Sequence, residues 1–161
     1  MSIIPVLGID PTQVHDKPQF RIGQHGAVIG QPTKLYKYVQ FTSFSTTASA
    51  GDVCYYNNLD GYKNNQVSTD LSAAATDFSD KAVGAGVSQA SVAALSFDYM
   101  WIQIRGPATL STALTAGSDG DPLTPHGSSD KTLDVAASFT DNICAIACDA
   151  SDKEIICMFP Y

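Results

Sequence analysis

The sequence has few basic residues. Lys and Arg together number 9 against 16 Asp and Glu, which gives a net charge of −7, and no stretch concentrates the basic side chains. Nucleic-acid binding depends on many Lys and Arg contacts to phosphates. The composition therefore predicts that neither DNA nor RNA is a partner.

The sequence also lacks a long apolar run. Nowhere does it reach the roughly 18 consecutive apolar residues that a membrane helix needs. The first residues, Met1 to Pro5, have neither the basic nor the apolar region of a signal peptide. We therefore expect no membrane partner, and a protein made and kept in a cytoplasm.

Cysteines are few for 161 residues. Without an export signal, free and mostly buried thiols are expected rather than a disulfide framework. Two residues four apart in a strand lie about 13 Å apart, so Cys144 and Cys148 can neither pair nor share a zinc ion with Cys157 and His126. A bridge between Cys148 and Cys157 would depend on the hairpin register and stays open.

The strongest pattern is the alternation of apolar residues in 99–108, which contains the lone Trp. It predicts a central strand in which Met100, Ile102 and Ile104 face the main core. Trp101 points to the other face, where we expect it to cover a glycine-containing strand at 83–87. Gly106 and Pro107 should then force a turn or bulge.

Other short runs predict strands near residues 34–41, 53–56, 66–68, 81–87, 132–135, 142–148 and 154–159. Asp60-Gly61 predicts a hairpin turn. The last two runs predict a buried terminal hairpin, and residues 70–80 are expected to form a short helix or a loop. The fold class is all-β: residues 21–161 form a single compact β-barrel or β-sandwich of short antiparallel strands.

Residues 1–20 are predicted to form an extended N-terminal arm, because three prolines prevent a regular helix or fully paired strand. Two interpretations stay open: a frayed terminus, or an arm that docks on a neighbouring subunit. The second makes the arm's aliphatic side chains interface candidates, namely Ile3, Ile4, Val6, Leu7 and Ile9. Arg105, a rare basic residue at the end of the central strand, is the candidate for a polar contact between subunits.

No arrangement of residues indicates catalysis, a metal or a cofactor. His15, His25 and His126 lie in proline- or glycine-rich segments, and no nucleophile-elbow pattern is present. The glycines of 20–30 are not followed by the helix that a phosphate-binding loop requires. The acidic loop residues lack calcium-loop spacing; they are Asp119, Asp121, Asp130 and Asp134. A hydrolase using Cys54 or Cys148 with a histidine is the disfavoured enzyme alternative.

Five motifs in a fixed order carry a resemblance that covers roughly residues 34–160. They are Tyr36-Lys37-Tyr38-Val39-Gln40, Gly51-Asp52-Val53, Ala82-Val83-Gly84-Ala85-Gly86-Val87, Tyr99-Met100-Trp101-Ile102-Gln103-Ile104-Arg105-Gly106-Pro107-Ala108 and Gly120-Asp121-Pro122-Leu123. In this order they resemble the capsid decoration, or cement, proteins of tailed bacteriophages. The proline-rich first 20 residues and the cysteine-containing terminal hairpin depart from that pattern.

The resemblance implies a structural virion protein that binds the outer surface of an assembled capsid and bridges capsomers. Its expected partners are the major capsid protein and further copies of itself, with a trimer favoured. Assembly would take place in the host cytoplasm. The alternative from another class is a carbohydrate- or receptor-binding β domain, with an aromatic platform made of Tyr55, Tyr56, Tyr62 and Tyr99.

Overall fold

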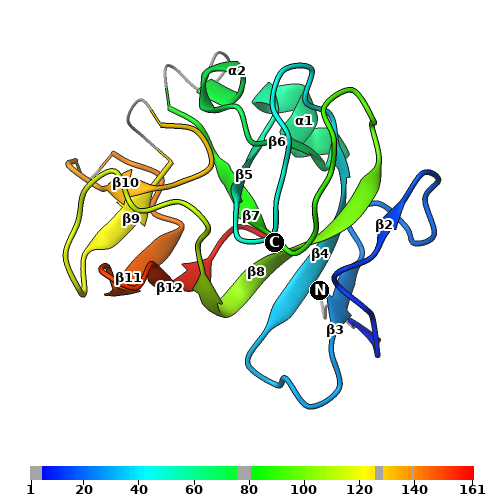
Figure 1. Ribbon diagram of the computed structural model, residues 1–161, viewed down its shortest axis with the longest axis horizontal. Coiled ribbons are helices and arrows are strands. Elements are labelled where there is room, and N and C mark those ends of the chain that lie inside the picture. Colours follow the sequence, from blue (N-terminus) through cyan, green and yellow to red (C-terminus); the bar gives the residue numbers. More distant parts are fainter. Residues whose placement is uncertain (1–4, 76–80, 126–128, 139) are drawn as a thin grey trace.

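The computed structural model describes residues 5–75, 81–125, 129–138 and 140–161, and strands dominate it (Figure 1). The strands are β1 (Val6–Leu7), β2 (Val14–His15), β3 (His25–Ala27), β4 (Leu35–Phe41), β5 (Val53–Tyr56), β6 (Gln66–Ser68), β7 (Gly84–Ser88), β8 (Tyr99–Thr109), β9 (Pro122–Thr124), β10 (Asp134–Val135), β11 (Ala145–Asp149) and β12 (Glu154–Met158). The helices are α1 (Asn58–Asn64) and α2 (Leu71–Ala75). The all-β prediction is confirmed.

Five strands close into a barrel. The pairings run from β4 to β6, β5, β7 and β8, and β8 returns to pair with β4. Closure leaves these five strands without free edges. The main core fills the interior, with Val39, Val53 and Ile102 among its fully buried residues. The expectation of antiparallel strands alone is wrong, because β4 pairs with β6, and β1 with β3, in parallel.

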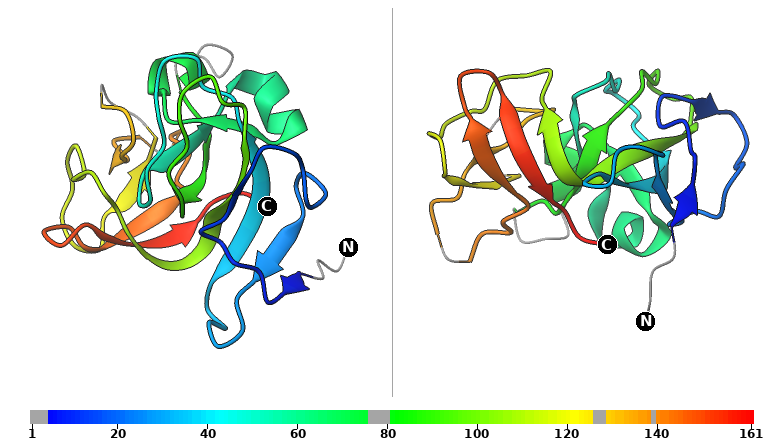
Figure 2. Two further views of the ribbon diagram at one scale, coloured as in Figure 1. Left: turned by 45° about the vertical axis from the view of Figure 1, so that its right-hand side comes forward. Right: turned by 90° about the horizontal axis from the view of Figure 1, so that it is seen from below.

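Two extensions flank the barrel. On one side β8 continues into a four-stranded antiparallel sheet in the order β8, β12, β11 and β9, with β10 at its edge. On the other side β3 and β1 extend the sheet beyond β4. The right-hand view of Figure 2 shows the first extension as β8, β12 and β11 side by side. Gly106, with φ +87, does not end β8 but lies where this strand passes from the barrel into the extension.

The predicted faces of β8 are confirmed, but the predicted partner of its tryptophan is wrong. Met100, Ile102 and Ile104 lie in the main core, whereas Trp101 belongs to a second cluster with Ile9, Tyr36 and Tyr38. The glycine beneath the Trp101 ring is Gly26 of β3, where an added Cβ would lie 2.8 Å from the ring. Gly84 and Gly86 of β7 instead meet Phe159 and Ile102.

An extended arm is not confirmed for the described part of residues 1–20. Val6 and Leu7 pair with β3, and Val14 and His15 pair with Tyr99 and Met100 of β8. These short strands therefore belong to the same sheet as the rest of the chain. Ile9 is buried in the tryptophan cluster, which ties this segment to the body through apolar contacts as well.

The hairpin from β5 to β6 forms as predicted, but its connection is a helix rather than an Asp-Gly turn. Gly61 lies inside α1, where a Cβ would be 2.8 Å from the carbonyl oxygen of Gln66. The close approach of α1 to the next strand thus requires glycine. Helix α2 begins the predicted 70–80 segment, whose residues 76–80 lie outside the described part of the chain.

Candidate interaction surfaces

The terminal hairpin carries an apolar outer face. In β12 the side chains alternate: Ile155 and Cys157 are buried, while Ile156 and Met158 are exposed. The expectation of a fully buried strand is therefore wrong. Glu154 lies on the same side of β12 as Ile156 and Met158, because residues two apart in a strand share a face. Its charged side chain therefore indicates from the sequence which side of the strand faces solvent.

This face continues across four neighbouring strands. Pro107 of β8 is the register partner of Ile156, Ile156 of Ile146, and Ile146 of Pro122 in β9. All four side chains are exposed, and together they form an apolar row perpendicular to the strands. We call these four residues, with Met158, the apolar sheet face. An exposed group of apolar side chains rimmed by polar residues is typical of a protein interaction site.

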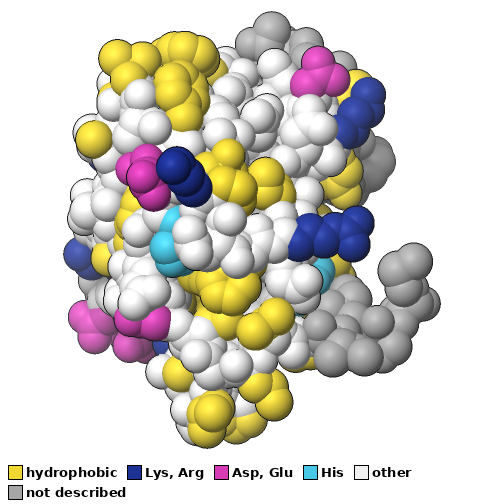
Figure 3. All heavy atoms as spheres, turned by 90° about the vertical axis from the view of Figure 1, so that its right-hand side faces the viewer, with side chains coloured by type: hydrophobic (Ala, Val, Ile, Leu, Met, Phe, Trp, Pro, Cys, Tyr) yellow, Lys and Arg dark blue, Asp and Glu magenta, His cyan; other side chains and the backbone are white. Residues whose placement is uncertain are grey.

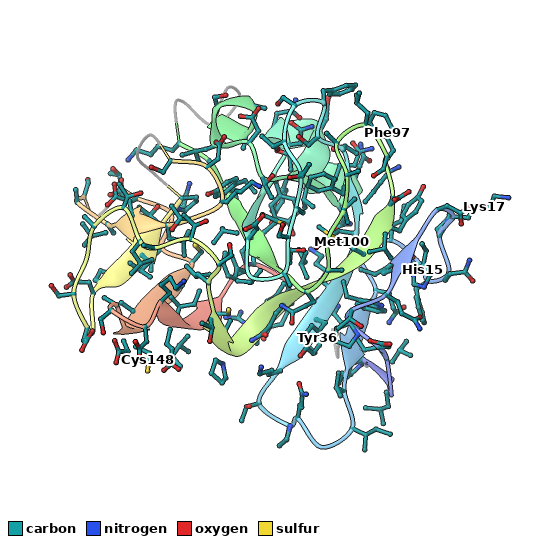
Figure 4. The ribbon with its side chains drawn as sticks, viewed as in Figure 1. His15, Lys17, Tyr36, Phe97, Met100 and Cys148 are labelled. Atoms are coloured by element: carbon teal, nitrogen blue, oxygen red, sulfur yellow. The ribbon has the colours of Figure 1, made fainter. Side chains whose placement is uncertain are left out.

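A second exposed apolar group, the apolar loop cluster, consists of Phe44, Leu95 and Phe97. The two phenyl rings meet edge to face with their centroids 5.3 Å apart. Leu95 and Phe97 have φ values of 64° and 56°, a left-handed conformation that is uncommon for bulky residues. Phe97 lies in the loop before β8 (Figure 4), and Figure 3 shows hydrophobic side chains gathered at the upper left of its face.

The predicted arm residues have different environments. Ile3 and Ile4 lie outside the described residues. Ile9 is buried, and Val6 packs against the tryptophan cluster, so both serve the chain's own fold. Among the described members of the set, Leu7 is the one with an exposed side chain, at 72%.

Arg105 is half-buried against the end of the chain. Its guanidinium carbon lies 4.4 Å from the centroid of the Tyr161 ring, a cation–π contact. Its Nε is buried without a hydrogen-bond partner. On β8 it pairs with Leu35 on β4 and with Met158, which belongs to the apolar sheet face. The candidate contact residue thus lies beside that face.

The predicted tyrosine platform does not form. Tyr55 and Tyr56 are fully buried in the main core, and the Tyr55 hydroxyl donates to the carbonyl of Thr132. Tyr99 is half-buried and stacks on Tyr38. Tyr62 is exposed, but its ring packs edge to face on Tyr56. The four rings therefore do not share one exposed surface.

The cysteines are free, as predicted: Cys54, Cys144 and Cys157 are buried and Cys148 is exposed. Cys157 pairs with Ala145 in the hairpin register, so Cys148 does not face it. Burial raises the pKa of the Cys54 thiol, and the negative charge of Asp52 raises it further. Such a thiol stays protonated at neutral pH and is a poor nucleophile.

Within the described residues, no group of three or more His, Cys, Asp and Glu side chains is placed to hold a metal ion. The acidic loop residues accept backbone hydrogen bonds: Asp119 from Ala150, Asp121 from Ser118 and Asp130 from Leu71. His126 lies outside the described residues. In the described part of the chain, no helix has the length and apolar character to cross a membrane.

Comparison with known proteins gives no family assignment. No protein-family model, no curated protein and no solved structure matches the chain. The exposed surfaces of the chain and its five sequence motifs are therefore the features that indicate a function.

Proposed function

We propose that this chain is a structural virion protein that binds the outer surface of an assembled tailed-phage capsid and stabilises it by bridging capsomers. The apolar sheet face is the observation that supports this proposal best. It presents side chains from four hydrogen-bonded strands of one sheet, and a surface already ordered by backbone pairing loses little conformational entropy on binding. The proposal assigns this face to contact with the major capsid protein.

The charge of the chain is compatible with such a role. A net charge of −7 keeps separate copies soluble and gives no attraction to the packaged genome. Binding through several copies at once would add avidity without a large contact area for each copy. A homo-oligomer, with a trimer favoured, is therefore part of the proposal.

Co-sedimentation with capsids that lack this protein tests the proposal. Wild-type protein should sediment with them, and Ile156→Asp should not, because a carboxylate would be desolvated in an apolar contact. Ile29→Asp is the matched control, since Ile29 is 79% exposed in the loop between β3 and β4. Phe44→Asp applies the same test to the apolar loop cluster.

Failure of the wild-type protein to sediment with capsids would overturn the proposal. Hits on a glycan array together with that failure would favour the carbohydrate-binding alternative. The sedimentation coefficient of each free variant shows whether a lost capsid contact results from a lost contact between copies.

A further inference from the structure

A hollow of about 340 Å³ lies between β3, β4, α1 and the chain end. Residues of α1 and the last residue of the chain, Tyr161, both line it. Its lining residues include three basic side chains, two tyrosines and no Asp or Glu; they are Gly23, His25, Lys37, Tyr62, Lys63, Asn65 and Tyr161. Two lysines thus line one hollow in a chain with 9 Lys and Arg against 16 acidic residues.

Lys37 contributes a buried ammonium group without a carboxylate partner. The residue is 5% exposed, and its Nζ donates a hydrogen bond of 2.8 Å to the Tyr56 hydroxyl. Nζ also lies 5.3 Å from the centroid of the Tyr56 ring. The described residues place no Asp or Glu within ion-pair distance of it. A buried charge without an opposite charge is unfavourable, so the site favours an added anion.

His25 supplies an unused polar atom at the same place. It is the direct cross-strand partner of Lys37, and its Nε2 is buried without a hydrogen-bond partner. Among the described residues, one other buried side-chain nitrogen or oxygen atom has no hydrogen-bond partner, namely Nε of Arg105. Both side chains contact the Tyr161 ring, His25 at 5.8 Å between ring centroids. The two side chains that carry these unpaired atoms therefore both contact the Tyr161 ring, which lines the hollow.

We propose that this hollow binds a carboxylate group, held by the Lys37 ammonium and the His25 imidazole. A carboxylate accepts hydrogen bonds from both donors and carries one negative charge, which balances the one buried ammonium. Lys63 is exposed and lies 3.9 Å from Asp60, so this solvent-screened pair adds little attraction, and Lys37 supplies the positive charge of the site. Tyr62 and Tyr161 provide apolar walls for the carbon atoms attached to the carboxylate.

The electrostatics of His25 agree with this assignment. Burial lowers its pKa, and the positive charge of Lys37 lowers it further, so the ring is neutral at neutral pH. A bound carboxylate would oppose both effects and raise the pKa of His25. The carboxylate could belong to a small organic acid or to an acidic side chain of a protein partner, and the two sources share this chemistry.

NMR titration of the full chain at neutral pH tests the proposal. Sodium acetate, compared with sodium chloride at equal ionic strength, should shift the His25 and Tyr161 ring resonances with saturation and raise the pKa of His25. Lys37→Met should abolish saturation, and Lys17→Met, which removes an exposed lysine that does not line the hollow, should retain it. In the wild-type protein, a rise in the pKa of His25 on adding acetate tests the proposal without any variant.

A linear response equal to that of chloride would overturn the proposal, as would saturation that persists in Lys37→Met. Tighter binding of phosphate than of acetate would overturn the assignment to a singly charged carboxylate. Comparison with acetyl-glutamate amide and a short acidic peptide separates the sources. Equal affinity indicates a small acid, and at least tenfold tighter binding of the peptide indicates a side chain of a partner.

Discussion

Ile155 and Ile156 are consecutive in β12 but lie on opposite sides of the sheet. Ile155 is fully buried in the main core, whereas Ile156 is 38% exposed on the apolar sheet face, opposite Ile146. The two side chains have the same composition and nearly the same place in the chain. They therefore separate the contribution of the core from that of the outer face.

Ile155→Ala should lower the free energy of unfolding by about 2 to 4 kcal/mol, because it leaves a cavity in the core. Ile156→Ala should change it by less than about 1 kcal/mol, because its side chain already contacts solvent. Urea denaturation of both variants measures the difference. Equal losses would show that the face is covered by the chain itself.

Gly26→Ala should destabilise the protein by about 1 to 3 kcal/mol through overpacking. The added methyl carbon would lie 2.8 Å from both the Trp101 ring and Cδ1 of Ile9. Because Trp101 is the single tryptophan, a change in its fluorescence emission would report the local shift. If stability and emission are unchanged, β3 moves away from the Trp101 ring without loss of unfolding free energy, which would contradict this prediction.

Lys37 should make stability depend on pH. Burial lowers its pKa from 10.5 to about 8, so between these values the unfolded chain binds more protons than the folded one. Unfolding free energy should therefore rise as pH increases through this window, by at most about 3 kcal/mol. Below pH 8 the penalty for burying the charge is fully present.

Lys37→Met is the control for this prediction, since it keeps an unbranched apolar chain but cannot titrate. Its unfolding free energy, measured by denaturation at several pH values, should lack the rise that the wild type shows. The difference between the two curves removes the contribution of tyrosines that titrate in the same range. Parallel curves would contradict the assignment.

Asp52→Ala should lower the unfolding free energy by about 2 to 3 kcal/mol. The buried Asp52 carboxylate lies 3.4 Å from Nζ of Lys131, accepts the backbone N–H of Ser49 and accepts the hydroxyl of Ser111. Asp60→Ala is the comparison, because its pair with Lys63 is exposed and spans 3.9 Å. That variant should lose less than about 0.5 kcal/mol.

The sequence predicted those features that depend on local patterns. The core-facing side of β8 follows from the period of two in residues 99–104, and the terminal hairpin follows from two apolar runs separated by a polar loop in residues 142–159. The packing of Trp101 on Gly26 could not be predicted, because a glycine beneath a ring from a distant segment has no local sequence pattern. In addition, residues 25–27 contain too few apolar residues to predict a strand. Likewise, nothing local indicates that Gly61 belongs to a helix.

The candidate surfaces were predictable to different degrees. The position of Glu154 indicates the outer face of β12, although consecutive apolar residues obscured it. The hollow at Lys37 was not predictable, because it depends on the register of His25 against Lys37 and on the position of Tyr161. Such contacts arise from pairing between distant segments, which the order of residues does not specify.

The cysteine pattern gives the molecule a single accessible chemical handle. Cys148 lies where the register of β11 shifts between Ala147 and Asp149, and its thiol is exposed (Figure 4), while the other three thiols are buried. A maleimide carrying a gold cluster or a fluorophore should therefore label the folded chain at one position. In the proposed complex with capsids, electron micrographs of that label would report the orientation of each bound copy directly.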